Sequence, residues 1–223
     1  MLTVKLLLII LGSILNSMTD FNEQQLISRE LDSMGNYENR TQSIYDSMLV
    51  EASNHWGIPA TRIDNIITKI GYHESHHTMD PMIKQRLSDG TVGRGRGIFQ
   101  FEVSSDDKQG GGATAFNRSV NYFNNNEIPK PDWVLNANYV DDFDATTLDS
   151  LNQRILMLAN MRQEPVVTAE SISDVFTNED IAEFWLNSHW KGDVSDRLAR
   201  KNSFLGSVKK YDSENPTENM LFE

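Results

Sequence analysis

The chain has 223 residues, 39% hydrophobic and 23% charged, which fits one sizeable soluble domain with a short extension. Its net charge of -12 argues against a general nucleic-acid binder and against attachment to anionic membranes, because both need clustered Lys and Arg. Cysteine is absent, which excludes disulfides and thiol chemistry.

The N-terminal residues 1–17 differ from this soluble composition. Lys5 precedes an apolar run over residues 6–15, which is shorter than the roughly 20 apolar residues of a spanning helix. A positive charge followed by a short apolar run is typical of a secretory signal peptide, with Ser17 as the small residue at the expected cleavage site. A buried N-terminal helix and a true start at Met18 are the alternatives. Residues 18–40 are expected to form an N-terminal helical extension.

Apolar residues at helical spacing predict the next elements. One helix is expected over residues 20–34, where Gly35-Asn36 stops it, and a second over residues 41–56. A third helix, over residues 61–74, buries a face of four isoleucines: Ile63, Ile66, Ile67 and Ile70. Regular helix must end shortly before Pro81, so residue 74 falls in the last turns of this third helix.

Glu74 is the candidate catalytic residue. A carboxylate at a helix C-terminus is disfavoured by the partial negative charge there, and apolar neighbours remove it from water. Both effects are expected to raise the pKa of Glu74. A Glu that stays protonated near neutral pH is what general acid catalysis requires.

A β-hairpin is predicted after this helix. Asp89-Gly90 lies between two short β-capable runs and is a strong turn signal. The returning strand carries Gly93, Gly95 and Gly97, so one of its faces has no side chains. Missing side chains mark the close approach of a ligand or of another backbone. We interpret this face as lying close to a sugar chain.

The rest of the chain is expected to be mostly helical. The predicted segments are a glycine loop over 110–112, a helix over 113–123, a loop-rich excursion over 124–144, helices opening at Thr146 or Thr147 and covering 178–190 and 195–211, and a polar tail over 212–223. The expected fold class is α+β, mostly α-helical, with one catalytic domain over residues 41–211.

The residues around Glu74 and the glycine run resemble a family signature. Glu74-Ser75, then Pro81, then Gly95 to Gln100 resemble the E-S…P…G-x-G-[LI]-[MF]-Q pattern of lytic transglycosylases of the soluble and goose-lysozyme type. The version here looks like copies carried by tailed bacteriophages, often in the virion. The resemblance covers about residues 71–102, with a fainter likeness over 113–123 and 184–190.

This resemblance implies a lysozyme-like fold, with a small hairpin beside the catalytic helix, that cleaves the β-1,4 bond between N-acetylmuramic acid and N-acetylglucosamine in peptidoglycan. Glu74 would protonate the leaving oxygen and then act as base on the muramic 6-hydroxyl, giving a 1,6-anhydro product. The acetamido group of the sugar assists, so the resemblance implies no protein nucleophile, metal or cofactor. By family analogy the substrate-binding residues are Ser75, Gly95, Gly97, Phe99, Gln100 and Asn187.

The implied partners are peptidoglycan glycan strands and other virion proteins, with no nucleic acid. The implied location is the virion or the host periplasm and cell envelope. An inactive structural virion protein is the non-enzyme alternative, and the intact Glu74 counts against it. Among the tryptophans, we expect only Trp190 to lie near the site.

A hydrolysing lysozyme is a second alternative. The spacing from Glu74 to Gln100 is longer than in common bacterial members of the family, which indicates a longer hairpin. If Asp80, Asp89 or Glu102 approaches Glu74 and holds a water, the enzyme would hydrolyse the bond instead.

A zinc peptidase is the third alternative. The run from His73 to His77 also fits H-E-x-x-H, with these two histidines as ligands and Glu74 as base. The extended form of the motif is absent, because Asp80 and Ile83 stand where its Gly and third His belong. The zinc interpretation also leaves the glycine run unexplained. Glu102 stays open as a third ligand, and we favour His76 and His77 as polar surface.

Overall fold

The structure is a computed structural model that describes residues 35–105, 110–135, 137–190 and 194–216. The chain divides into two compact units, Met1–Gln42 and Ser43–Glu223. The predicted signal segment and the predicted helix over 20–34 lie outside the described residues. Within the described residues, no helix is long and apolar enough to cross a membrane.

In the first unit the structure describes residues 35–42, and all of them are helical. The predicted start of the second helix at residue 41 is therefore wrong, because the described helix already includes Gly35 and Asn36. A glycine costs only about 1 kcal/mol relative to alanine in a helix, so it does not end one without a second signal. Thr41 donates a hydrogen bond from its hydroxyl to the Tyr37 carbonyl, which adds one contact within this turn (2.9 Å).

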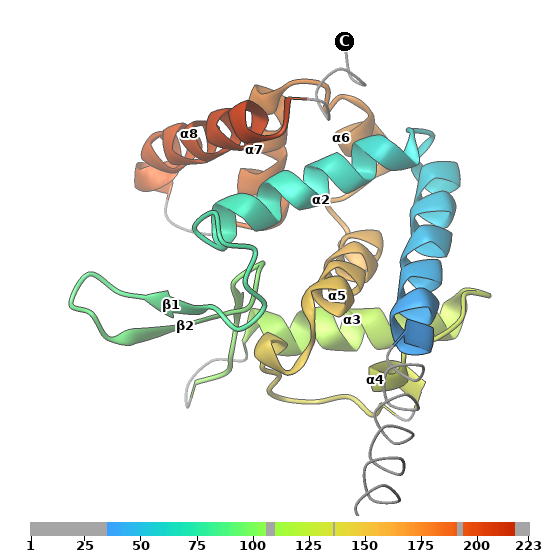
Figure 1. Cartoon of the computed structure of the whole chain (residues 1–223). Coiled ribbons are helices and arrows are strands. Elements are labelled where there is room, and N and C mark those ends of the chain that lie inside the picture. The colour runs from blue at the N-terminus through green and yellow to red at the C-terminus, as the bar shows by residue number, and fades with distance from the viewer. Residues whose placement is uncertain (1–34, 106–109, 136, 191–193, 217–223) are drawn as a thin grey trace, which may run out of the picture. The chain divides into compact units, whose positions relative to one another are not determined.

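The second unit is mostly helical with one small antiparallel sheet, so the expected α+β class is confirmed (Figure 1). It opens with a helix over residues 43–56. The elements that follow are α2 (Ala60–Glu74), β1 (Lys84–Arg86), β2 (Val92–Arg96), β3 (Phe101–Glu102), α3 (Gly111–Asn125), α4 (Asp132–Leu135), η1 (Ala145–Thr147), α5 (Ser150–Gln163), α6 (Ala169–Ser173), α7 (Asn178–Ser188), η2 (Val194–Asp196) and α8 (Arg197–Glu214).

Helix α2 forms as the sequence predicts. Pro59 precedes it, and its isoleucine face is almost completely buried in the core. The helix ends at Glu74 because His76 and His77 adopt left-handed backbone conformations, with φ of 51° and 70°. The carboxyl group of Glu74 therefore lies at the point where the chain leaves helix α2.

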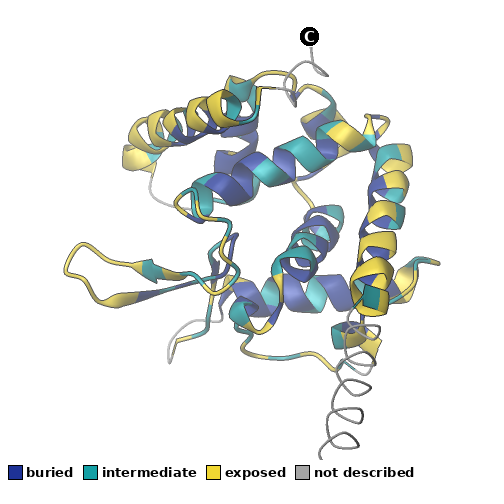
Figure 2. Ribbon diagram, in the orientation of Figure 1, coloured by how far each residue is buried: buried dark blue, intermediate teal, exposed yellow. Residues whose placement is uncertain are grey.

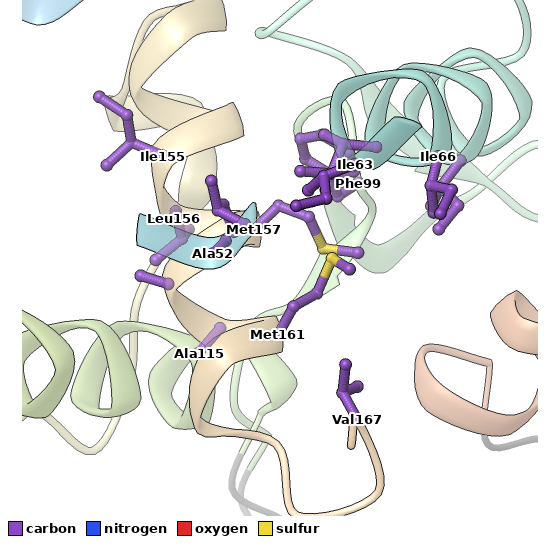
Figure 3. Close-up of a cluster of buried hydrophobic side chains, with 14 of the residues drawn as sticks. Ala52, Ile63, Ile66, Phe99, Ala115, Ile155, Leu156, Met157, Met161 and Val167 are labelled. Atoms are coloured by element: carbon purple, nitrogen blue, oxygen red, sulfur yellow. The ribbon is translucent and has the colours of Figure 1, made fainter. Parts of the chain in front are cut away.

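The helices bury their apolar faces against one another (Figure 2). Helix α3 packs on α5, and α8 packs on both α2 and α7. Side chains from α2, α3 and α5 meet in one core cluster, part of which is drawn in Figure 3. A buried ion pair also ties α2 to α8, since the Lys69 ammonium lies 2.9 Å from the Asp212 carboxylate. This packing fixes the last turn of α2 against α7 and α8.

The predicted hairpin is confirmed. Strands β1 and β2 pair antiparallel and β3 pairs with the other edge of β2. Gly90 has a φ of 83°, which favours glycine, and the Asp89 carboxylate accepts a hydrogen bond from the Thr91 amide (2.9 Å).

Three predicted boundaries differ from the structure. The segment 110–112 is not a loop, because α3 begins at Gly111 and a Cβ at Gly112 would lie 2.6 Å from the Phe143 carbonyl oxygen. These glycines permit close packing rather than flexibility. Helix α5 begins at Ser150, where the Asp149 carboxylate caps it, and α8 continues to Glu214, into the predicted tail.

Candidate active site

Glu74 is the last residue of α2, and its two carboxyl oxygens have different surroundings. The Trp185 indole N–H donates a hydrogen bond to Oε1 (2.6 Å), and His189 Nε2 lies 3.7 Å from the same oxygen. The side chain keeps 16% of its exposure. Among the described residues, no hydrogen bond to Oε2 is found. One oxygen is therefore held by the protein and the other is available to a ligand.

The pKa of Glu74 is raised, as the sequence analysis expects. Burial is the main cause, and the neighbouring His189 and the Trp185 hydrogen bond offset part of the rise. Because Oε1 accepts a hydrogen bond from Trp185, the proton of the acid form belongs on Oε2. The arrangement thus directs the acidic proton toward the side on which none of the described residues donates a hydrogen bond to Glu74.

Trp185, on α7, holds its indole rigidly. Its ring is 2% exposed, stacks on Phe204 at 5.0 Å and meets His73 edge-on at 4.8 Å. The expectation that Trp190 alone among the tryptophans lies near the site is wrong, because Trp185 contacts Glu74 directly. The available signal is general, since a buried indole N–H usually finds a hydrogen-bond acceptor.

His189 joins Glu74 to the second half of the sequence motif. Its Nε2 donates a hydrogen bond to the Phe99 carbonyl (2.8 Å), which identifies Nε2 as the protonated ring nitrogen because a carbonyl only accepts. From the other side, a Cβ on Gly71 would lie 2.8 Å from Ile98 Cγ2. The turn over residues 97–100 therefore packs directly on the last turns of α2.

The glycine face of β2 is filled by the chain's own side chains. A Cβ on Gly93, Gly95 or Gly97 would clash with a glutamine side chain, in each case a different one: Gln85, Gln100 and Gln153. All three glycines are buried. The expectation that a sugar chain lies close to this face is therefore wrong, because the three glutamine side chains already fill the space beside the glycines. Because these glycines have no side chains, three glutamine side-chain amides can pack beside the strand.

Gln153, on α5, fixes the turn next to Glu74. It is fully buried, and its Oε1 accepts a hydrogen bond from the Ile98 amide (2.7 Å). Its Nε2 lies 2.9 Å from the Pro81 carbonyl and 2.9 Å from the Leu148 carbonyl. One amide therefore connects α5 with both ends of the hairpin. The sequence analysis misses this residue, because a lone Gln on a helix gives no distinctive pattern.

The predicted substrate-binding residues fall into different places. Gln100 lies in the turn with a φ of 50°, and its buried Oε1 has no hydrogen-bond partner among the described residues. Phe99 is fully buried in the core (Figure 3). Ser75 is also fully buried, and its hydroxyl accepts a hydrogen bond from the Met79 amide (2.9 Å). Phe99 and Ser75 therefore lie in the protein interior next to the site and support it through packing.

Asn187 on α7 and Trp190, two residues after this helix ends, complete the set of predicted positions. Asn187 is exposed and accepts a hydrogen bond from Arg197 (2.9 Å). The Trp190 ring lies 6.2 Å from that of Trp185 and is partly exposed. Trp190 thus neighbours the residue that holds Glu74, whereas the Asn187 side-chain amide is engaged with α8.

The histidines of the H-E-x-x-H pattern do not form the arrangement of a zinc peptidase. That motif needs both histidines on one continuous helix, but α2 ends at Glu74, before His77. His73 Nδ1 and His77 Nε2 each lie 2.9 Å from the hydroxyl of Ser207 on α8. No group of three or more His, Cys, Asp or Glu side chains in the described part of the chain is placed to hold a metal ion.

The three carboxylates considered as partners of Glu74 are engaged elsewhere. Asp80 accepts a hydrogen bond from the Met82 amide (2.8 Å), Asp89 binds within the hairpin turn, and Glu102 lies 3.5 Å from Arg94. The charged groups that act most strongly on Glu74 are basic, namely His189, His76 and Arg200.

The chain matches no known family model, and it has no significant match among curated proteins or solved structures. A function for this site therefore rests on its residues and geometry.

Proposed function

We propose that the protein is a peptidoglycan lytic transglycosylase with a lysozyme-like fold, in which Glu74 is the general acid and then the general base. The observation that carries the proposal is the largely buried carboxyl group of Glu74, which has a raised pKa and is held through one oxygen by Trp185. It lies beside the turn over residues 97–100, so the two halves of the resembling motif are neighbours.

The reaction uses one proton on Glu74. The acid donates it to the glycosidic oxygen as the bond from muramic C1 to that oxygen breaks, and the N-acetylglucosamine hydroxyl leaves. The resulting carboxylate then accepts the proton of the muramic 6-hydroxyl while O6 bonds to C1. The product is a 1,6-anhydro sugar, no water is consumed, and Glu74 returns to its acid form.

The surroundings of Glu74 favour a lyase over a hydrolase. An inverting hydrolase needs a second carboxylate about 6.5–9.5 Å away to activate water, and a retaining one needs it at about 5–5.5 Å. Asp80, Asp89 and Glu102 are each held by other groups. The Trp185 N–H supports the carboxylate form that the second step requires.

Digestion of purified sacculi followed by mass spectrometry of the released fragments tests this proposal. Anhydro-muropeptides support a lytic transglycosylase, whereas reducing ends indicate a hydrolysing lysozyme. No release at all favours a structural virion protein. A metal chelator should leave the activity unchanged, and complete loss on chelation would favour a peptidase. The resemblance to copies in tailed bacteriophages adds the virion or the cell envelope as the proposed location.

A further inference from the structure

The β1–β2 hairpin is basic in an otherwise acidic chain. Its residues 84–96 include two Lys or Arg on each strand and a single acidic residue, Asp89, whereas the whole chain has a net charge of -12. The basic residues are Lys84, Arg86, Arg94 and Arg96. In Figure 1 the hairpin extends away from the helices, and Figure 2 shows that its outer part is exposed. We call these four side chains and the surface they share the basic hairpin face.

All four side chains project from the same side of the hairpin. Lys84 pairs with Arg96 and Arg86 pairs with Val92, with a shift of register between the two pairs. Gln85, between them on β1, lies against the glycine face, so Lys84 and Arg86 lie on the opposite side. The opposite side of β2 is the glycine face, which the glutamines fill. The basic side chains are therefore concentrated on one surface rather than spread around the hairpin.

The two strands of this face differ in how their charges are held. Arg96 donates hydrogen bonds to the Gly93 and Gly95 carbonyls and lies 3.6 Å from Asp144. Arg94 donates to the Val103 carbonyl (2.9 Å) and lies near Glu102. Both arginines are thus fixed by the protein.

On β1, by contrast, Lys84 and Arg86 are exposed, and neither has an acidic partner among the described residues. Lys84 and Arg86 therefore leave two positive charges that no acidic side chain of the described residues compensates, and these charges are accessible to an anion.

The base of the hairpin adjoins the candidate active site. The Gly97 amide donates a hydrogen bond to the Ile83 carbonyl (2.8 Å), which closes the hairpin one residue before the turn that carries Phe99. The Phe99 carbonyl is in turn bound by His189, beside Glu74. The hairpin therefore leads directly into the turn that packs on the last turns of α2, so the basic hairpin face adjoins the candidate active site through that turn.

We propose that the basic hairpin face binds the carboxylates of the short peptides attached to muramic acid, so that the enzyme selects peptide-bearing glycan over bare glycan. This inference rests on the proposed function. The stem peptides carry free carboxylates within reach of the sugar that is cleaved, and exposed Lys and Arg attract them. The rest of the chain is acidic and repels the same carboxylates, so the basic hairpin face determines where an anionic substrate binds.

Binding to fluorescent muropeptide tetrasaccharides, measured by anisotropy, tests the inference. Every protein carries Glu74→Gln so that the ligand is not cleaved. The test variant adds Lys84→Glu and Arg86→Glu, and the control adds Lys130→Glu and Lys209→Glu, which change the net charge equally. A third variant, Lys84→Arg with Arg86→Lys, keeps the charge. The second ligand is the same tetrasaccharide with its carboxyl groups converted to amides.

The test variant should bind the peptide-bearing ligand roughly tenfold more weakly at low salt, since each exposed pair contributes up to about a factor of five. The loss should shrink below about twofold with the amidated ligand and at 0.5 M salt, because salt screens exposed charges. The control and the charge-conserving variant should bind like the parent.

Three results would overturn the inference: an equal loss with the amidated ligand, an equal loss in the control, or selective binding of a glycerol-phosphate polymer instead of the muropeptide. Circular dichroism confirms that each variant is folded. Cleavage of sacculi by the wild-type chain is scored separately. Binding that follows the carboxylates without any cleavage would reject the proposed function and not the basic hairpin face.

Discussion

His73 and Glu74 are adjacent at the end of α2, both are largely buried, and both contact Trp185, yet the protein treats them differently. His73 is held on the α8 side, where its Nδ1 lies 2.9 Å from the Ser207 hydroxyl. Burial and the charges of His76 and His77 lower its pKa to about 4, so it is neutral and hydrogen-bonded at neutral pH. Glu74 is held on the α7 side through Oε1, whereas Oε2 has no hydrogen-bond partner in the described part of the chain.

The structure thus shows one ionisable group bound at Ser207 and one with an oxygen that no described residue binds, and we propose that the second is the reactive group. Burial shifts the pKa of both side chains toward the neutral form, upward for Glu74 and downward for His73. A perturbed pKa alone does not identify a catalytic residue, because structural networks shift pKa values too. The open oxygen at Glu74 distinguishes the two, and the following predictions break or sharpen this contrast.

Replacing Glu74 by Gln should have the largest effect, a loss of activity of roughly a thousandfold or more, because general acid–base transfer contributes about 10²–10⁴. The fold should persist, since the Gln carbonyl still accepts the Trp185 hydrogen bond. Wild-type protein loses stability as pH rises from the unfolded-state pKa of about 4.3 through the raised pKa of Glu74, because the folded state binds that proton more tightly. The Gln variant should lack this loss.

Sacculus turnover and chemical denaturation between pH 4 and pH 8 measure both effects. Appreciable residual turnover by Glu74→Gln would contradict the assignment of the acid. A variant that is equally inactive but unfolded by circular dichroism would leave only the pH dependence of wild-type stability to decide the case.

Replacing Trp185 by Phe should lower kcat about tenfold, because the ring still packs but Glu74 loses its orientation. The indole hydrogen bond lowers the pKa of Glu74, so its removal should move the alkaline limb of the pH–rate profile to higher pH. Trp190→Phe is the matched control, and its profile should match that of wild type. An unshifted limb in Trp185→Phe would show that the hydrogen bond does not tune the acid.

Replacing His73 by Phe should leave activity within about twofold while changing the pH dependence of stability. A His with a folded pKa of about 4 and an unfolded pKa of about 6.5 stabilises the fold above pH 6.5, and this contribution is lost as pH falls to 4. The loss is roughly 2 kcal/mol in wild type, after a discount for partial exposure. Denaturant unfolding at pH 4.5 and pH 7 should show a smaller difference in the variant, and inactivity would instead favour the zinc alternative.

The core helix and the hairpin were predictable because their signals are local. The isoleucine spacing specifies α2 up to Glu74, and Asp89-Gly90 specifies the turn. The direction of the pKa shift of Glu74 followed from the same local information. The start of α3 was less predictable, because a glycine such as Gly112 marks either a break or a close contact, and only tertiary packing decides between them.

The partners of Glu74 were not predictable in the same way. Trp185 and His189 lie more than a hundred residues further along the chain, and their contacts depend on how α7 packs on α2. The glycine face misled for a related reason. An alternating glycine strand indicates that something approaches closely, but the sequence does not say whether it is a sugar or Gln153 from α5.

Neutralising the other acidic groups near the motif should have the smallest effect. Asp80→Asn, Asp89→Asn and Glu102→Gln should each leave the turnover of sacculi within about twofold and the anhydro product unchanged, because none of these carboxylates acts strongly on Glu74. Asp89 is the sharpest case, since hydrogen bonds from Thr91 lower its pKa and keep it as a carboxylate that serves the turn. A different outcome is a loss of activity in one of these variants together with reducing ends in the wild-type product. That carboxylate would then be the water-activating base of a hydrolase, and Glu74 would be only one of two catalytic carboxyl groups.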